Sequence, residues 1–262
     1  MMKPKTIAGR AWGSLLCAML LAASAWTNEA NAETYVILSL IGDHLTLVGM
    51  GGQLGSHLDQ NPHQTVPVNG TGFDDFAVRA ADTAIAKARP AAQVVALRAS
   101  DPDLYKMRDS WLDSDTVEVK QVMSFLPETI QRSPESWLLL IVPYRDELEL
   151  KTDRDRRGVG KYSGLGFYVD AMTRMRDFDK KQAMRGYLGV FAHFQMMLIN
   201  LKNGTTDAQK RVVLGTTYAA AAAEDRTAWN ALTEAQKVKA LQSLIKRGIE
   251  ESLPPMLSSK KP

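Results

Sequence analysis

The spacing of hydrophobic and polar residues changes several times along the chain, and the first changes predict strands. From Thr34 to Leu40 the residues are mostly β-branched or apolar, and apolar residues return in alternation from Leu45 to Val48. Alternation with a period of two is typical of a half-buried strand, and the intervening Gly42-Asp43 pair is typical of a tight turn. We therefore expect two short strands joined by this turn.

A long loop and then a helix are expected next. The segment from Gly49 to Gly72 is rich in Gly, Asn, Gln, His and Pro and has almost no period, which is typical of a loop. Thr71 can cap a helix whose first turn carries Asp74 and Asp75, because negative charge stabilises this end of a helix. Apolar residues then recur at helical spacing as far as Pro90, at positions Phe73, Phe76, Ala80, Ala84 and Ala88.

The middle of the chain alternates between strand and helix patterns. Val94 to Leu97 has the pattern of a short strand, and residues 103–131 have helical spacing that restarts at a capping box formed by Asp115 and Glu118. Trp137 to Val142 is almost continuously apolar, which predicts a central strand covered on both faces.

The last third predicts antiparallel strands and a closing helix. Leu165–Val169, Tyr187–Leu201 and Arg211–Tyr218 have strand patterns, and Asn203-Gly204 between the last two is a strong hairpin signal. The stretch from Met172 to Arg185 is basic and amphipathic, which is typical of a surface helix or of a segment that contacts lipid or a partner.

The closing helix is expected to begin at a capping box, since Gln236 follows Thr233 by three positions. Pro254-Pro255 is expected to end this helix. Its apolar stripe comprises Val238, Leu241, Ile245 and Ile249.

These elements predict an α/β (α+β) fold, a mixed sheet with flanking helices in the order β-β-α-β-α-α-β-β-β-β-α. Residues 33–262 are expected to form a single domain. Together with an export signal in residues 1–32, the order of elements resembles that of the small α/β domains of periplasmic envelope-assembly proteins, such as the curli secretion channel protein and the N-terminal domain of the Tol-Pal propeller protein. The resemblance includes no shared motif, so it assigns no functional residue.

Residues 1–32 have the pattern of a cleavable signal peptide. Lys3, Lys5 and Arg10 form a basic head, an apolar stretch follows from Ala11 to Trp26, and Ala30-Asn31-Ala32 supplies the small residues that signal peptidase requires. The apolar stretch is shorter than the roughly 20 residues of a membrane-spanning helix. We therefore expect a periplasmic or secreted protein, and an uncleaved leader acting as an anchor is the alternative.

Charge and cysteine content narrow the functional classes. The chain has 32 Lys and Arg against 29 Asp and Glu, and three of these basic residues and one acidic residue lie in the leader, so the remaining charges nearly balance. That balance argues against a nucleic-acid partner, which requires a concentrated basic face. Cys17 is the only cysteine and lies in the leader, so the exported protein is expected to have neither a disulfide nor a cysteine nucleophile.

The first candidate site is a cluster of metal-ligand types, because imidazole and carboxylate groups are what zinc or non-haem iron would need. Its spacing matches no known metal motif, and a solvated polar loop is the alternative. The candidate ligands are Asp43, His44, His57, Asp59 and His63.

The second candidate site lies between Lys151 and Gly166, where basic residues alternate with glycines. Backbone amides near glycine and guanidinium groups can hold an anionic ligand or partner. The alternative is a hairpin connection whose charges are hydrated. The candidate residues are Arg154, Arg156, Arg157 and Lys161.

The remaining polar residues suggest weaker hypotheses. Asp146, Glu147 and Glu149 form a group of carboxylates, and paired carboxylates serve in glycoside cleavage. His193 lies in a predicted strand and is expected to be a packed or hydrogen-bonded sheet residue rather than a base.

No complete catalytic motif is present, and the chain contains no G-x-S-x-G sequence. We therefore expect a non-catalytic binding or accessory component of the bacterial cell envelope, whose partner is an envelope protein or an anionic ligand. The alternative is a secreted metal-dependent hydrolase that uses the His- and Asp-rich region 43–75.

Overall fold

The computed structural model describes residues 33–50, 61–99, 101–114, 117–126, 130, 135–151, 156–177 and 182–259. The expected leader, residues 1–32, lies outside these ranges, and so do His57, Asp59 and Arg154. The predictions made for those residues therefore stay predictions.

A nine-stranded mixed sheet forms the centre of the molecule, which confirms the expected α+β class. Its strands follow the order β3-β2-β7-β8-β5-β1-β4, with β6 paired to β7 and β9 paired to β8. The strands are β1 (Thr34–Ser39), β2 (His44–Gly49), β3 (His63–Pro67), β4 (Gln93–Leu97), β5 (Ser136–Pro143), β6 (Arg145–Lys151), β7 (Arg156–Asp177), β8 (Gln182–Asn200) and β9 (Thr206–Ala219).

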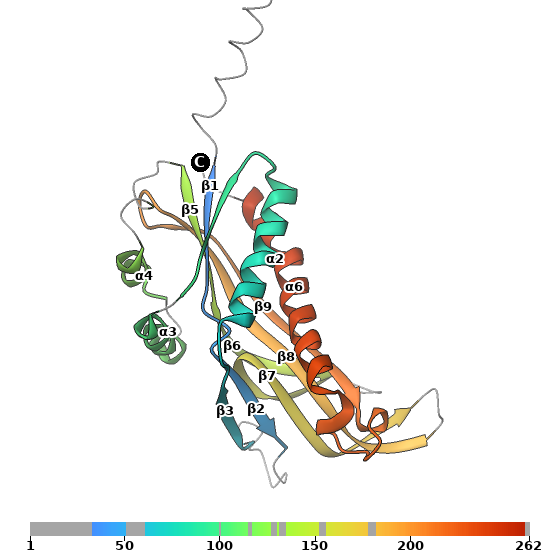
Figure 1. Ribbon diagram of the computed structural model, residues 1–262. Coiled ribbons are helices and arrows are strands. Elements are labelled where there is room, and N and C mark those ends of the chain that lie inside the picture. The colour runs from blue at the N-terminus through green and yellow to red at the C-terminus, as the bar shows by residue number, and fades with distance from the viewer. Residues whose placement is uncertain are drawn as a thin grey trace, which may run out of the picture.

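Helices cover both faces of this sheet. Figure 1 shows α2 (Gly72–Ala88) and α6 (Glu234–Ser258) side by side on one face, and α3 (Pro102–Ser114) and α4 (Val119–Phe125) on the other. Two short 3-10 helices, η2 (Ala220–Ala222) and η3 (Trp229–Ala231), connect β9 to α6.

Strand β5 is the central strand that its apolar run predicted. All eight of its residues are buried, and it lies between β1 and β8. Leu139 and Ile141 pack into the core on the side of α2 and α6, whereas Leu138 and Leu140 pack on the side of α3 and α4. Alternate residues of one strand therefore supply both halves of the core.

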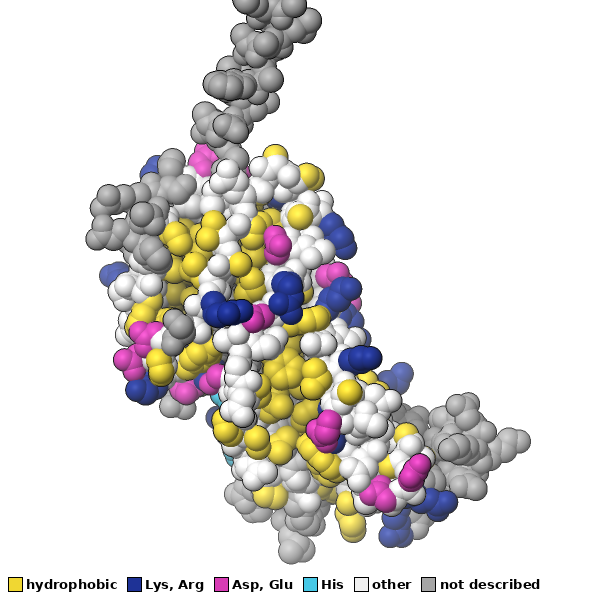
Figure 2. All heavy atoms as spheres, viewed as in Figure 1, with side chains coloured by type: hydrophobic (Ala, Val, Ile, Leu, Met, Phe, Trp, Pro, Cys, Tyr) yellow, Lys and Arg dark blue, Asp and Glu magenta, His cyan; other side chains and the backbone are white. Residues whose placement is uncertain are grey.

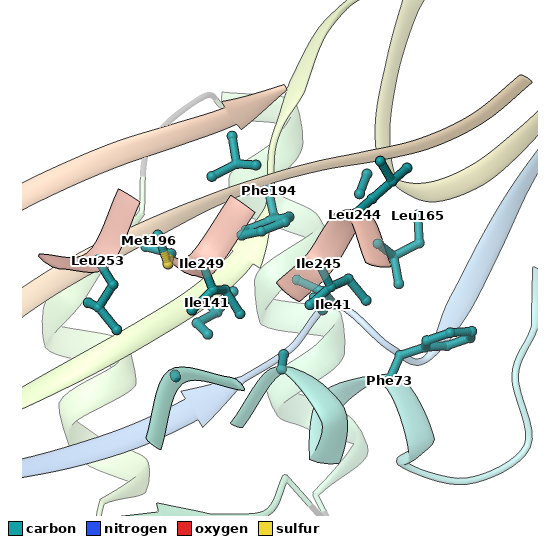
Figure 3. Packing of buried hydrophobic residues seen from close by; sticks show 14 of the residues in the cluster. Ile41, Phe73, Ile141, Leu165, Phe194, Met196, Leu244, Ile245, Ile249 and Leu253 are labelled. Atoms are coloured by element: carbon teal, nitrogen blue, oxygen red, sulfur yellow. The ribbon is translucent and has the colours of Figure 1, made fainter. Parts of the chain in front are cut away.

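The larger half of the core lies under α6. The helix lies close to the sheet at Gly248, where an added Cβ atom would be 2.5 Å from Val212 Cγ1. The expected capping box of Thr233 and Gln236 is present at the start of the helix. Figure 3 shows this packing, in which Leu244, Ile245, Ile249 and Leu253 of α6 lie near Phe194 and Met196 of β8.

The first two strands do not form the hairpin that their spacing predicted. β1 instead pairs in parallel with β4 and β5, and β2 pairs with β3 and β7. The backbone N–H groups of Ile41 and Gly42 donate to the buried carboxylate of Asp74, at 2.7 and 3.1 Å. These bonds fix the backbone after β1, and β2 then joins a different part of the sheet.

Two strands lie where loops were expected. β3 lies inside the expected loop 49–72, and β6 and the start of β7 occupy much of the expected hairpin connection between the Trp137 and Leu165 strands. β3 is an edge strand in which only Val66 is partly buried, so it lacks the apolar alternation of a half-buried strand. β6 does alternate, with Leu148 and Leu150 buried between charged residues.

Two other expected elements differ from the structure. The basic stretch 172–185 contributes to β7 and β8 rather than to a helix. α6 continues through Pro254 and Pro255 to Ser258, because Leu253, Met256 and Leu257 remain buried in the core and offset the missing proline N–H groups.

Candidate functional site

The candidate site is a cavity of about 380 Å³ lined by β2, β3, α3, β6 and the first half of β7. Strand pairing brings its walls together, since β2 pairs with β3 on one side and with β7 on the other. Thr46 of β2 is opposite Thr65 of β3, and Arg145 of β6 is opposite Ser163 of β7. Side chains from four strands therefore meet in one place.

Basic side chains dominate the charge of this cavity. His44, His63, Arg145 and Lys161 line it, against one carboxylate, that of Asp109. Arg145 and Lys161 are exposed, and in the described part of the chain neither forms an ion pair. These two cations therefore remain available to an anion that enters the cavity.

Neutral donors complete the lining. Thr65 and Ser163 contribute hydroxyl groups, whereas the Thr46 hydroxyl already donates to the Ser163 backbone oxygen at 3.3 Å. Tyr162 lies edge-on to the His63 ring at 6.2 Å between centroids. Hydroxyl and imidazole N–H groups can donate hydrogen bonds to carboxylate or phosphate oxygens. The cavity thus combines charge and hydrogen-bond donors suited to an oxyanion.

A buried arginine holds the part of the cavity wall that carries His44. Arg108 of α3 directs its two terminal nitrogens at the two carboxylate oxygens of Asp43 and also donates to Leu40 O at 2.8 Å. Asp43 in turn holds His44 Nδ1 at 3.0 Å. Although burial would raise the pKa of Asp43, the hydrogen bonds from His44 and Arg108 outweigh it and hold that pKa well below its ordinary value.

A second buried carboxylate fixes the chain that leads into β2. Asp74 accepts hydrogen bonds from Ser39 Oγ at 2.7 Å and from Tyr105 Oη at 3.0 Å, besides the two backbone N–H groups named above. Burial raises the pKa of Asp74 despite these bonds. Gly42 is required beside it, because an added Cβ atom would lie 2.7 Å from the Asp74 backbone nitrogen. Asp74 is therefore a structural centre and not only a charge at a helix terminus.

The structure places the candidate metal ligands in different environments. Both oxygens of Asp43 are engaged by Arg108, whereas His44 and His63 line the cavity. Among the residues that the structure describes, no three His, Cys, Asp or Glu side chains are arranged to hold a metal ion. Because His57 and Asp59 lie outside these residues, the five-residue metal site stays a prediction.

The candidate anion site is only partly described. Lys161 lines the cavity, while Arg156 and Arg157 begin β7 opposite Lys151 and Leu150 and their side chains lie outside the description. Arg145 is the functional candidate that sequence reasoning missed. The alternation of Leu148 and Leu150 with charged residues was the available signal, since it identifies Arg145 as the first residue of a strand.

Comparisons with known proteins identify no family. No family model matches the chain, and no curated protein matches it. One solved structure, described as a homolog of the neuraminyllactose-binding hemagglutinin from Helicobacter pylori, is similar with a TM-score of 0.40 and 5% sequence identity, covering 87% of this chain and 83% of that chain. None of the helices in the described part of the chain has the length and apolar character needed to cross a membrane.

Proposed function

We propose that this protein is an exported, non-catalytic binding component of the bacterial cell envelope that holds an anionic group between β2, β3, β6 and β7. One observation carries the proposal. Arg145 and Lys161 reach the same cavity as His44 and His63 from neighbouring strands, and no described acidic residue forms an ion pair with Arg145 or Lys161.

The size and exposure of the cavity support a small anionic group. A volume of about 380 Å³ lies in the range of small-molecule sites. Figure 2 shows basic and acidic side chains interspersed on the face that it presents, with no extended basic surface there. A local group such as a carboxylate or phosphate fits a cavity of this size.

Export and lack of catalysis rest on the sequence. The leader pattern of residues 1–32 supports delivery to the periplasm or beyond, and residues 33–262 would then act as one domain. Binding is preferred to catalysis because the chain contains no G-x-S-x-G motif and its only cysteine, Cys17, lies in the leader.

Charge reversal tests the anion site directly. Isothermal titration of the purified protein with inorganic phosphate is expected to show saturable binding that Arg145→Glu and Lys161→Glu each weaken at least about tenfold, or ~1.4 kcal/mol. Lys239→Glu is the matched control, because Lys239 is exposed on α6 and lies outside the cavity. Equal binding by all three variants and wild type would contradict the proposal.

The secreted metal-dependent hydrolase is the second candidate, favoured by one observation. His44 and His63 line the same cavity, with His57 and Asp59 between them in the sequence. Metal analysis of the purified protein tests this candidate. Stoichiometric zinc in the wild-type protein that is lost from both His57→Ala and His63→Ala would favour the hydrolase over the binding function.

A further inference from the structure

Strand β3 lies at one border of the sheet, beside β2 (Figure 1). Among the strands that the structure describes, β2 is its only partner, so its outer edge is open there. An open edge presents backbone N–H and C=O groups to which an extended segment of another chain can add as a further strand. The side chains on the two faces of this edge indicate what kind of segment fits.

The hydrogen-bond register identifies the residues of β3 that face outward. Pro62 O accepts the Gly49 N–H at 2.9 Å, and at the other end of β3 the Val68 N–H donates to the chain that precedes β2 at 2.8 Å. Backbone groups alternate in direction along an antiparallel strand, so those of His63 and Thr65 point away from β2. Both residues are exposed. Their N–H and C=O groups can therefore pair with an added strand.

One face of this edge belongs to the basic cavity, the candidate site described above. His63 and Thr65 line it, together with His44, Arg145 and Lys161. In an antiparallel pair, directly opposite residues direct their side chains to the same face. A residue added opposite Thr65 therefore points its side chain to the face of the basic cavity. Because Arg145 and Lys161 are exposed cations, an acidic side chain is favoured at that position.

The other face of the same edge carries an apolar cavity of about 390 Å³. Leu47 of β2, Val169 of β7 and Trp229 of η3 line it, and each is half-buried. Gln64 of β3 also lines it, since Gln64 pairs with Leu47 and points away from the face that carries Thr65. Residues that flank the acidic one in an added strand would point to this side. Apolar side chains are favoured there, because a charge against these walls would lack a partner.

We propose that the outer edge of β3 binds an extended peptide segment of a partner protein, antiparallel to β3, in which acidic and apolar residues alternate. Its backbone pairs with His63 and Thr65, its acidic side chains enter the basic cavity, and its apolar side chains enter the cavity beside Trp229. Antiparallel addition is favoured because its pairing is slightly more stable per residue than parallel pairing. This inference rests on the proposed anion site and specifies its ligand as a carboxylate carried by a peptide strand.

Backbone methylation of a synthetic peptide tests the pairing directly. The probe is an acetylated and amidated hexapeptide in which glutamate and valine alternate, and isothermal titration of the purified protein is expected to show saturable binding. In the proposed register the glutamate N–H groups face β3 and the valine N–H groups face away. N-methylation of the glutamates should therefore weaken binding at least about tenfold, whereas N-methylation of the valines should change it by less than about twofold.

Side-chain exchanges in the same peptide test the two faces separately. Glutamine in place of glutamate should weaken binding at least about fivefold, because the charge that complements Arg145 and Lys161 is lost. Serine in place of valine should weaken it by at least about threefold, because apolar contact with the cavity beside Trp229 is lost. Full binding by either exchanged peptide would contradict the role assigned to that face.

Two variants of Thr65 test the edge from the side of the protein. Thr65→Pro removes an outward N–H without removing a bond to β2, and proline is tolerated on an edge strand at such a position. Thr65→Val is the matched control, because it also lacks the hydroxyl group but keeps the N–H. Peptide binding should be at least about tenfold weaker in the proline variant than in the valine variant. Circular dichroism confirms that both variants are folded.

Three results would overturn the peptide ligand. They are equal binding of the two methylated peptides, equal peptide binding by Thr65→Pro and Thr65→Val, and a wild-type dimer that Thr65→Pro dissociates in analytical ultracentrifugation. The last result would assign the edge to a second copy of the chain. Phosphate titration of the same samples tests the anion site by itself, so phosphate binding without peptide binding rejects only this inference, and loss of both rejects the proposed function as well.

Discussion

Arg108 and Asp43 form a two-pronged ion pair in which the arginine is 1% exposed and the aspartate 27% exposed. The pair joins α3 to the chain between β1 and β2, and through His44 it reaches the basic cavity. Removing one partner of such a pair leaves a buried charge without compensation. The pair therefore links the stability of the fold to the geometry of the site.

We expect Asp43→Asn to lower the free energy of unfolding by about 2–3 kcal/mol. The loss is below the full value for a buried pair because Asp109 still faces Arg108. Urea denaturation followed by circular dichroism measures it. Asp103→Asn is the control, because its partner Lys106 is exposed and an exposed ion pair contributes little to stability. Equal losses in the two variants would show that burial of Arg108 is unimportant.

The buried His193 predicts a dependence of stability on pH. Its pKa in the folded protein lies below the ordinary 6.5, so the unfolded chain takes up a proton first as the pH falls. The free energy of unfolding should therefore fall with pH below about 6.5, by at most ~1.4 kcal/mol per pH unit, until the folded pKa is reached.

Urea denaturation at pH 7.5 and 5.5 measures this dependence, and His193→Gln should reduce it. The comparison isolates His193, because Asp74, whose raised pKa acts in the opposite direction, is the same in both proteins. His63→Gln is the control, since His63 is exposed. A pH dependence that persists unchanged in His193→Gln would contradict the assignment of the slope to this residue.

Close approach of β2 and β7 at Gly166 gives a prediction about packing. An added Cβ atom there would lie 2.2 Å from the Thr46 backbone oxygen and 2.5 Å from the Phe191 ring. Since a backbone atom cannot move aside cheaply, Gly166→Ala should destabilise the protein by about 3 kcal/mol, near the upper end for overpacking. Thermal unfolding compares it with Gly72→Ala, which has no atom within 4 Å of the added Cβ and should be close to neutral.

The elements whose signal is local were predicted well from the sequence. β5 follows from one apolar run, the β8–β9 hairpin from Asn203-Gly204, and the start of α6 from Thr233 and Gln236. β3 was missed because an exposed edge strand needs no apolar face. Its side chains form no pattern that indicates its backbone pairing with β2. The tight-turn signal at Gly42-Asp43 was outweighed by Asp74, which lies more than 30 positions away.

The candidate site was predictable only in part, because its residues come from separate predictions. His44, His63 and Lys161 belonged to two different hypotheses, and they share one cavity because β2 pairs with both β3 and β7. Arg145 joins them through the register of β6 with β7, which a sequence alone does not fix. Likewise, the hydrogen bond of His193 Nδ1 depends on the Tyr162 carbonyl of the neighbouring strand β7.

The capping box of α6 gives a final prediction, about the stability of the start of this helix. Thr233 Oγ1 accepts the Gln236 N–H at 3.3 Å, and the Gln236 side chain accepts the Thr233 N–H at 2.8 Å. Thr233→Ala removes the first of these bonds and should lower the free energy of unfolding by about 1 kcal/mol, measured by urea denaturation. Thr233→Ser keeps the hydroxyl and should restore most of the loss. If alanine and serine destabilise the protein equally, the methyl group of Thr233 rather than its hydroxyl stabilises this end of the helix.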